Sequence, residues 1–165
     1  MRQVWIPKAG PPEVLQVRDV PEPQPGPGQV RVAVEAIGVN FADIVGRLGM
    51  YADAPRLPFV PGFEVAGRVD ALGEGVEASR LGQEVIGLTR FGGYSERVCI
   101  PAAQALPRPA TMSAGQGAAF LVSALTAYAG LVALGGIKRG ERVLIQAAAG
   151  ALQQLLIRGS GGGAD

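Results

Sequence analysis

The sequence predicts a mainly β protein with helices, of the α+β class, built around a small antiparallel barrel or sandwich. The chain has 165 residues, and 48% of them are hydrophobic, which is enough apolar material for the core of a domain. It holds 25 Gly and 13 Pro, the residues that separate short strands. Apolar and polar residues alternate in part of residues 1–106, and this period changes after Pro109.

The expected strands are short and bounded by Gly or Pro. In residues 30–36 every second residue is apolar, the period of a half-buried strand. The preceding segment, 21–28, is expected to be a loop, because its four prolines lack a backbone donor. The other expected strands are Val14–Val20, Phe63–Leu72, Glu84–Leu88 and Tyr94–Ile100, and a short helix is expected over Phe41–Leu48.

A different pattern follows Pro109. Ser113 and Gln116 form a capping-box pair, which predicts that the apolar run behind them is helical. Residues 113–137 carry no charge and exceed the roughly 20 residues that span a bilayer. Their small and polar residues favour a buried helix over a membrane span. The apolar segment 143–147 is typical of a strand in a parallel sheet.

Composition excludes several kinds of chemistry. Histidine is absent, which removes the commonest general base and metal ligand. The single Cys99 excludes an intrachain disulfide and a Cys-rich zinc site, and we interpret it as a small core residue. The net charge is +1 without a basic run, so nucleic acid and anionic membranes are not expected partners. The first residues lack the apolar core of a signal peptide, and we expect a cytoplasmic protein.

Six segments occur in an order and at spacings that match a known family. They are Pro25–Val30, Gly38–Asp43, Pro58–Glu64, Gly92–Glu96, Leu125–Tyr128 and Gly140–Gly150. Over residues 1 to about 150 the chain resembles the zinc-independent quinone oxidoreductase branch of the medium-chain dehydrogenase/reductase superfamily. The resemblance implies a GroES-like, partly open catalytic β-barrel in residues 1–110. It also implies linking helices and one incomplete Rossmann strand of a nucleotide-binding domain in 111–150.

The resemblance also implies a reaction, in which hydride passes from NADH or NADPH to a quinone or an α,β-unsaturated carbonyl. Zinc is not expected, because Asn40 stands where zinc-dependent relatives have a Cys, and Phe63 stands where they have a His. The implied catalytic residues are Tyr51, Asn40 and Asp43, and the implied cofactor-binding residues are Asn40, Thr126, Ala149 and Gly150. Tyr51 carries a donor suited to a carbonyl oxygen that becomes negative during transfer. A homo-oligomer, such as a dimer, is expected.

Residues 151–165 depart from the family pattern, since no further glycines of a dinucleotide-binding turn follow Gly150. We interpret this tail as a linker, an added end or a shifted reading frame. An incomplete nucleotide domain predicts weak cofactor binding and impaired activity for this chain. The alternative is a non-enzymatic GroES-like module that serves assembly or ligand binding.

Simpler roles stay open for the same residues. Asn40 can be the N-cap of a helix, Asp43 a charge in its first turn, and Tyr51 a packing aromatic. The Thr126 hydroxyl can bond back within its own helix. A buried Glu64 needs a partner, and a structural ion pair is the expected one. The pair Gly92–Gly93 is expected to form a hairpin turn.

Overall fold

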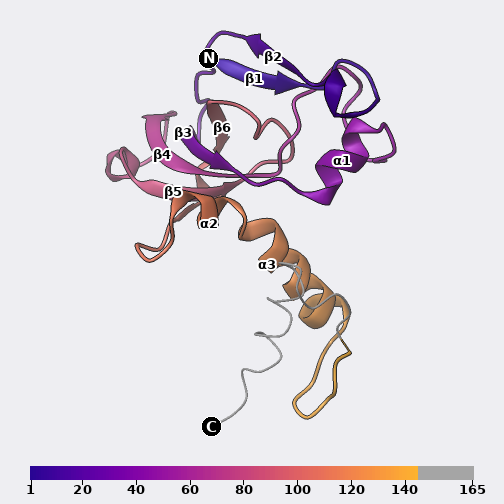
Figure 1. Cartoon of the computed structure of the whole chain (residues 1–165). Coiled ribbons are helices and arrows are strands. Elements are labelled where there is room, and N and C mark those ends of the chain that lie inside the picture. Colours follow the sequence, from indigo (N-terminus) through magenta and orange to yellow (C-terminus); the bar gives the residue numbers. More distant parts are fainter. Residues whose placement is uncertain (145–165) are drawn as a thin grey trace. The chain divides into compact units, whose positions relative to one another are not determined.

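A curled antiparallel sheet of five strands, in the order β6-β3-β4-β5-β7, dominates the computed structural model (Figure 1). The structure describes residues 1–144, which fall into two units, Met1–Ala119 and the described part of Phe120–Asp165. The strands are β1 (Arg2–Trp5), β2 (Gln16–Asp19), β3 (Gln29–Ile37), β4 (Glu64–Leu72), β5 (Glu84–Leu88), β6 (Arg97–Pro101) and β7 (Ala105–Pro107). This mainly β architecture with a few helices confirms the predicted fold class, a partly open barrel.

The core lies on one face of the five-stranded sheet. β3 contributes Val30 and Val32, which are fully buried and form a cluster with residues of the strands around them: Val69, Val85, Ile100 and Ala105. The alternation in residues 30–36 therefore predicted the core positions of β3 correctly in its first half. Further along, Val34 and Ala36 are only half-buried, because the register of β3 against β4 shifts between these two residues.

The strands β1 and β2 form a separate two-stranded ribbon. The segment Tyr94–Glu96 joins this ribbon to the main sheet. Val4 N–H donates to the Tyr94 carbonyl, Glu96 N–H to the Arg2 carbonyl, and Val34 N–H to the Glu96 carbonyl. Ser95 forms only an isolated bridge with Gln3, and the continuous ladder with β3 starts at Arg97, so the expected strand over 94–100 begins three residues later than predicted.

Three expectations about strands were incomplete or wrong. β5 and β6 are not neighbours in the sheet, so Gly92–Gly93 lies in a crossing segment and does not form a hairpin turn. The strands β1 and β7 were missed, because three or four residues are too few to show a period. The expected strand 14–20 is shorter, since a 3₁₀ turn occupies Pro12–Val14 before β2 begins at Gln16. Further 3₁₀ turns lie at Ala78–Arg80 and Ala102–Gln104.

The helix α1 (Phe41–Arg47) follows β3 and agrees with the expected helix to within one residue. The helix α2 (Ala114–Ala118) begins at the predicted capping box: the Ser113 hydroxyl accepts from Gln116 N–H, and the Gln116 side chain accepts from Ser113 N–H. α2 lies against β3, β4 and β5 and closes one side of the barrel.

The apolar run beyond α2 is not one buried helix. It continues as α3 (Leu121–Tyr128) and a π-helical segment, η4 (Ala129–Leu134), and Leu125, Tyr128 and Leu134 are exposed. The run is interrupted at Ala119, which leaves helical geometry and ends α2, and it changes from α- to π-helical at Ala129. Among the described residues, no helix is long and apolar enough to cross a membrane.

The expected nucleotide-domain strand 143–147 lies mostly outside the described residues, and the two that are described, Val143 and Leu144, have no regular secondary structure. Ala149, Gly150 and the tail 151–165 lie outside the described residues altogether. The division of the chain near residues 110 and 150 stays a prediction.

Candidate active site

Asn40 and Asp43, two of the predicted site residues, occupy the start of α1. Asn40 is the N-cap residue, with extended backbone angles, so the simpler role proposed for it is correct. Asp43 lies three residues on and accepts a hydrogen bond from Asn40 N–H at 2.8 Å. The Asp43 carboxylate also stabilises the positive end of the helix, as a first-turn charge does.

Asp43 does more than cap the helix, because three parts of the chain converge on it. Besides Asn40 N–H, its carboxylate accepts from Gly62 N–H at 2.9 Å and from the Tyr94 hydroxyl at 3.3 Å. Only 7% of Asp43 is exposed. The carboxylate therefore ties α1 to the segments before β4 and before β6, and Asp43 is a positioning residue in this structure.

Burial changes the acidity of Asp43 and Tyr94. Desolvation raises the pKa of Asp43 above its ordinary value, although the hydrogen bonds from Asn40, Gly62 and Tyr94 act in the opposite direction. Burial, followed by the nearby Asp43 charge and the bond to it, raises the pKa of the Tyr94 hydroxyl. Tyr94 therefore keeps its proton and acts as a donor to Asp43 throughout the physiological range.

The side-chain amide of Asn40 points to a second buried carboxylate. Asn40 Nδ2 donates to Glu64 Oε1 at 3.0 Å, and only 2% of Glu64, at the start of β4, is exposed. The predicted need for a partner is met here by an amide. The other N–H of Asn40 Nδ2 has no acceptor among the described residues. The amide thus keeps one donor free while the first fixes its orientation.

Two close backbone approaches make this geometry possible. A Cβ on Gly62 would lie 2.6 Å from Tyr94 Cδ1 and 2.8 Å from Gly93 Cα, and Gly62 has a φ of +106°. A Cβ on Gly38 would lie 2.3 Å from the Ala118 carbonyl oxygen and 2.4 Å from Glu64 Cγ. The motif glycines thus allow the segments that carry Asp43, Tyr94 and Glu64 to meet.

A cluster of aromatic rings lies next to this polar network, because Phe63 stands between Gly62 and Glu64. Its ring contacts Tyr51 edge-on, with the ring centres 6.0 Å apart, and Phe91 at 5.1 Å. Phe91 in turn meets the buried Phe59 at 5.6 Å. Tyr51 is therefore a packing aromatic, yet its hydroxyl has no hydrogen-bond partner among the described residues. The rings form an apolar surface with one free donor.

The remaining predicted site residues belong to the second unit of the chain. Thr126 lies on α3, and its hydroxyl donates to the Val122 carbonyl at 2.7 Å, the back-bonded alternative. Ala149 and Gly150 lie outside the described residues. Cys99 in β6 is a free, half-buried thiol whose pKa is raised by burial, and it is not part of the main core cluster.

Sequence reasoning missed three participants: Tyr94 as donor to Asp43, and Phe63 and Phe91 as neighbours of Tyr51. Tyr94 follows the pair Gly92–Gly93 and Phe63 follows Gly62 within the family motifs, and these places next to glycines were the available signal. Phe91 directly precedes Gly92 but lies outside the motif Gly92–Glu96, and its ring contacts depend on the crossing segment between β5 and β6. Among residues 1–144, no group of three or more Cys, Asp or Glu side chains could hold a metal ion.

The fold is that of a GroES-like domain. It consists of a curled antiparallel barrel, the helix α1 after the long strand β3, and the helix α2, which closes one side. The chain belongs to the family "Alcohol dehydrogenase GroES-like domain", which it matches over residues 26–110. It is a member of the medium-chain dehydrogenase/reductase superfamily, and its relatives there include quinone oxidoreductases, which confirms the family resemblance.

Individual relatives match most of this chain but only part of their own length. The synaptic vesicle membrane protein VAT-1 homolog of Rattus norvegicus is 46% identical over 136 residues, which are 82% of this chain and 34% of the relative. The quinone oxidoreductase of Lama guanicoe is 39% identical over 152 residues, 91% of this chain and 46% of the relative. The structure of the quinone oxidoreductase of Thermus thermophilus, also solved with NADPH, has a TM-score of 0.84 and 39% identity, covering 97% of this chain and 50% of that one. This chain thus spans between a third and half of the length of these relatives.

Proposed function

We propose that this chain is the substrate-side part of an NAD(P)H-dependent oxidoreductase that reduces quinones or α,β-unsaturated carbonyls. The single observation that carries the proposal is the arrangement of segment 62–64. This segment bonds to Asp43 and Asn40 through its first and last residues and presents the Phe63 ring to Tyr51. Free donors therefore stand beside flat apolar rings, which suits a planar carbonyl compound. Relatives named quinone oxidoreductases support the same substrate class.

In this proposal the chain contributes position and hydrogen bonds. The aromatic rings exclude water and hold a planar substrate by stacking and edge contacts. The Tyr51 hydroxyl and the free N–H of Asn40 donate to the carbonyl oxygen, whose negative charge grows during reduction. Glu64 and Asp43 hold Asn40 from its side chain and its backbone, so that the donor is already oriented when the substrate arrives.

The residues fit a nicotinamide as well as a quinone, because both are flat and both carry a carbonyl group. When bound, NAD(P)H supplies the hydride. Asn40 and Thr126 are the described residues that we propose to hold it, with Ala149 and Gly150 beyond them. Support for Thr126 comes from its exposed position: its hydroxyl donates to Val122, yet the same oxygen can still accept a bond from a carboxamide. Two relatives whose structures were solved with NADPH are named quinone oxidoreductases.

We also propose that zinc takes no part in the reaction. The chain has no His and one Cys. At the two positions where the zinc-dependent relatives carry ligands, Asn40 bonds to Glu64 and Phe63 packs against two rings. An amide and a phenyl ring are not the donors that a catalytic zinc ion requires.

The test is a titration of the 165-residue chain with NADPH, followed by cofactor fluorescence, and then an assay of NADPH oxidation by 1,4-naphthoquinone. Saturable submillimolar binding and turnover support the proposal. Tyr51→Phe, which removes only the hydroxyl, should lower kcat by roughly 10²-fold, the effect of losing one donor to a developing negative oxygen. Tyr128→Phe is the matched control, since Tyr128 is exposed on α3, and it should leave kcat unchanged.

Absence of both NADPH binding and turnover would favour the alternative, a non-enzymatic ligand-binding or assembly module. NADPH binding without any effect of Tyr51→Phe would support the cofactor part of the proposal and reject the role of this hydroxyl.

We further propose a homo-oligomer in the cytoplasm. The exposed apolar residues Leu125 and Leu134 support oligomer formation, which light scattering after gel filtration measures directly.

A further inference from the structure

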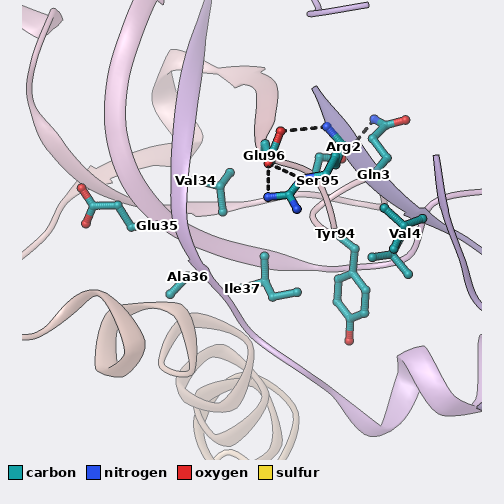
Figure 2. A pocket seen from close by; sticks show the side chains of 11 residues that line it. Arg2, Gln3, Val4, Val34, Glu35, Ala36, Ile37, Tyr94, Ser95 and Glu96 are labelled. Carbon is teal, nitrogen blue, oxygen red and sulfur yellow. Dashed lines mark hydrogen bonds and ion pairs between the residues drawn. The ribbon is translucent and has the colours of Figure 1, made fainter. Parts of the chain in front are cut away.

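A hollow of about 350 Å³ lies where the β1–β2 ribbon joins β3 (Figure 2). The rings of Tyr51, Phe63 and Phe91 do not line it. Its walls come from β1, from the β2 residue Val17, from the second half of β3 and from the segment Tyr94–Glu96. The volume is within the range of about 300–1,000 Å³ that is usual for small-molecule sites. None of the roles proposed above uses this hollow.

The apolar wall results from an irregularity in β3. In a regular strand Val34 and Ile37 would point to opposite faces, because they are three residues apart. The register shift between Val34 and Ala36 turns the strand, and both side chains point toward Tyr94 and Val4, whereas Glu35 points to the other side (Figure 2). A bulge that re-aims a side chain in this way is a common feature of binding sites.

The polar side chains around the hollow already have partners. The Arg2 guanidinium binds Glu96 at 2.6 Å, and Gln3 Nε2 donates to the Ser95 hydroxyl at 3.0 Å (Figure 2). Glu35 lies 3.7 Å from Arg108, and Tyr94 donates to Asp43. The backbone groups of residues 94–96 are bonded to β1 and β3. The charges at the rim are therefore balanced, and the exposed wall that needs a partner is apolar.

Tyr94 determines what shape of molecule fits. Its ring forms one side of the hollow (Figure 2). Its hydroxyl donates to Asp43 at 3.3 Å, so the ring cannot swing aside without breaking that bond. A fixed phenol ring opposite Val34 and Ile37 favours a flat aromatic molecule, which gains edge or offset-stacked contacts beyond simple burial.

We propose that this hollow is a second binding site, which takes neutral, planar aromatic molecules. The site shares no residue with those proposed to contact the substrate, and the Tyr94–Asp43 bond links it to Asn40. An anion gains little here, since Arg2 is already neutralised by Glu96, and it would lose its own hydration. Neutral ligands are therefore preferred over charged ones of the same shape.

The experiment is a titration of the ¹⁵N-labelled 165-residue chain with 2-naphthol, which is neutral at pH 7, followed by two-dimensional NMR without any nucleotide. Saturable shifts are expected for the backbone amides of Val4, Val34, Ala36 and Tyr94. Titration with 2-naphthoate, which has the same rings and a negative charge, should give an affinity at least ten-fold weaker. Equal affinity for the two compounds would overturn the preference for neutral ligands.

A variant pair tests the location. Val17→Asp places a charge on the wall of the hollow and should weaken 2-naphthol binding at least ten-fold. Val17 is 67% exposed, so the fold tolerates the change, and Val17→Ser is the second variant if it does not. Leu81→Asp makes the same kind of change at a residue that is 57% exposed and outside the hollow, and it should leave binding unchanged. Unaltered binding in Val17→Asp, shifts centred on Tyr51 and Phe91, or no saturable shifts would each overturn the proposal.

Discussion

Replacement of Gly62 by Ala tests whether the approach of three backbone segments at Asp43 is as close as the structure shows. Gly62 has a φ of +106°, which L side chains rarely adopt. Its carbonyl accepts from the Thr89 hydroxyl at 2.6 Å, and its N–H donates to Asp43. The position is therefore fixed on both sides of the residue, and the backbone cannot relax without breaking these bonds.

The expected cost of Gly62→Ala has two parts. An alanine held at this φ costs about 1–3 kcal/mol in backbone strain. The new Cβ would lie 2.6 Å from Tyr94 Cδ1 and 2.7 Å from Tyr94 N, so overpacking adds about 1–3 kcal/mol. The total is about 2–6 kcal/mol, a large share of the roughly 5–15 kcal/mol by which a domain is stable.

Gly28→Ala is the matched control. Gly28 also has a positive φ, +71°, but a Cβ there would meet no atom within 4 Å, so this variant carries only the backbone strain. Urea unfolding followed by far-UV circular dichroism and by the fluorescence of Trp5, the single tryptophan, measures both variants. If Gly62→Ala lost no more stability than Gly28→Ala, the close packing against Tyr94 would be refuted.

Two further perturbations test the electrostatics. Because burial raises the pKa of Asp43 above its ordinary value of 3.8, the fold binds this proton more tightly than the unfolded chain does. The stability that Asp43 contributes is then complete below that value and is lost as pH rises through the higher folded pKa. The unfolding free energy of the wild type relative to Asp43→Asn should thus fall from about pH 3 to pH 7, and a rise would contradict the raised pKa. Arg108→Met should lower the free energy of unfolding by about 1–3 kcal/mol, because the side chain of Arg108 is 9% exposed and bonds Glu84 at 2.7 Å. Arg2→Met should lower it by less than about 1 kcal/mol, because the side chain of Arg2 is 69% exposed. Equal losses of unfolding free energy in urea would refute this difference.

Local signals in the sequence were sufficient for several elements. The capping pair Ser113 and Gln116 placed the start of α2 correctly, because both of its hydrogen bonds form within four residues. The strand 84–88 was predicted to the residue, since a turn at Gly82 and a change of composition bound it. The start of α1 was predicted for the same reason, with Asn40 as its cap.

The rest depends on contacts between distant segments, which no local period records. The long apolar run after Ser113 looked like one buried helix, but nothing in its composition revealed the break at Ala119 or the change to a π-helix after Tyr128. The bond from Tyr94 to Asp43 joins residues 51 positions apart and requires the crossing segment between β5 and β6. Both residues lie in family motifs of the sequence, yet only the fold shows that Tyr94 donates a hydrogen bond to Asp43.

Asn40 shows why a simple structural role and a role in a site need not compete. The cap uses the backbone N–H of Asn40, which Asp43 accepts, and this bond fixes the start of α1. The side-chain amide is left for Glu64, and that bond consumes one of its two N–H groups. A ligand can therefore use the second N–H without cost to the helix. For that reason, finding Asn40 at the N-cap does not count against its proposed role: the cap is what holds the donor in place.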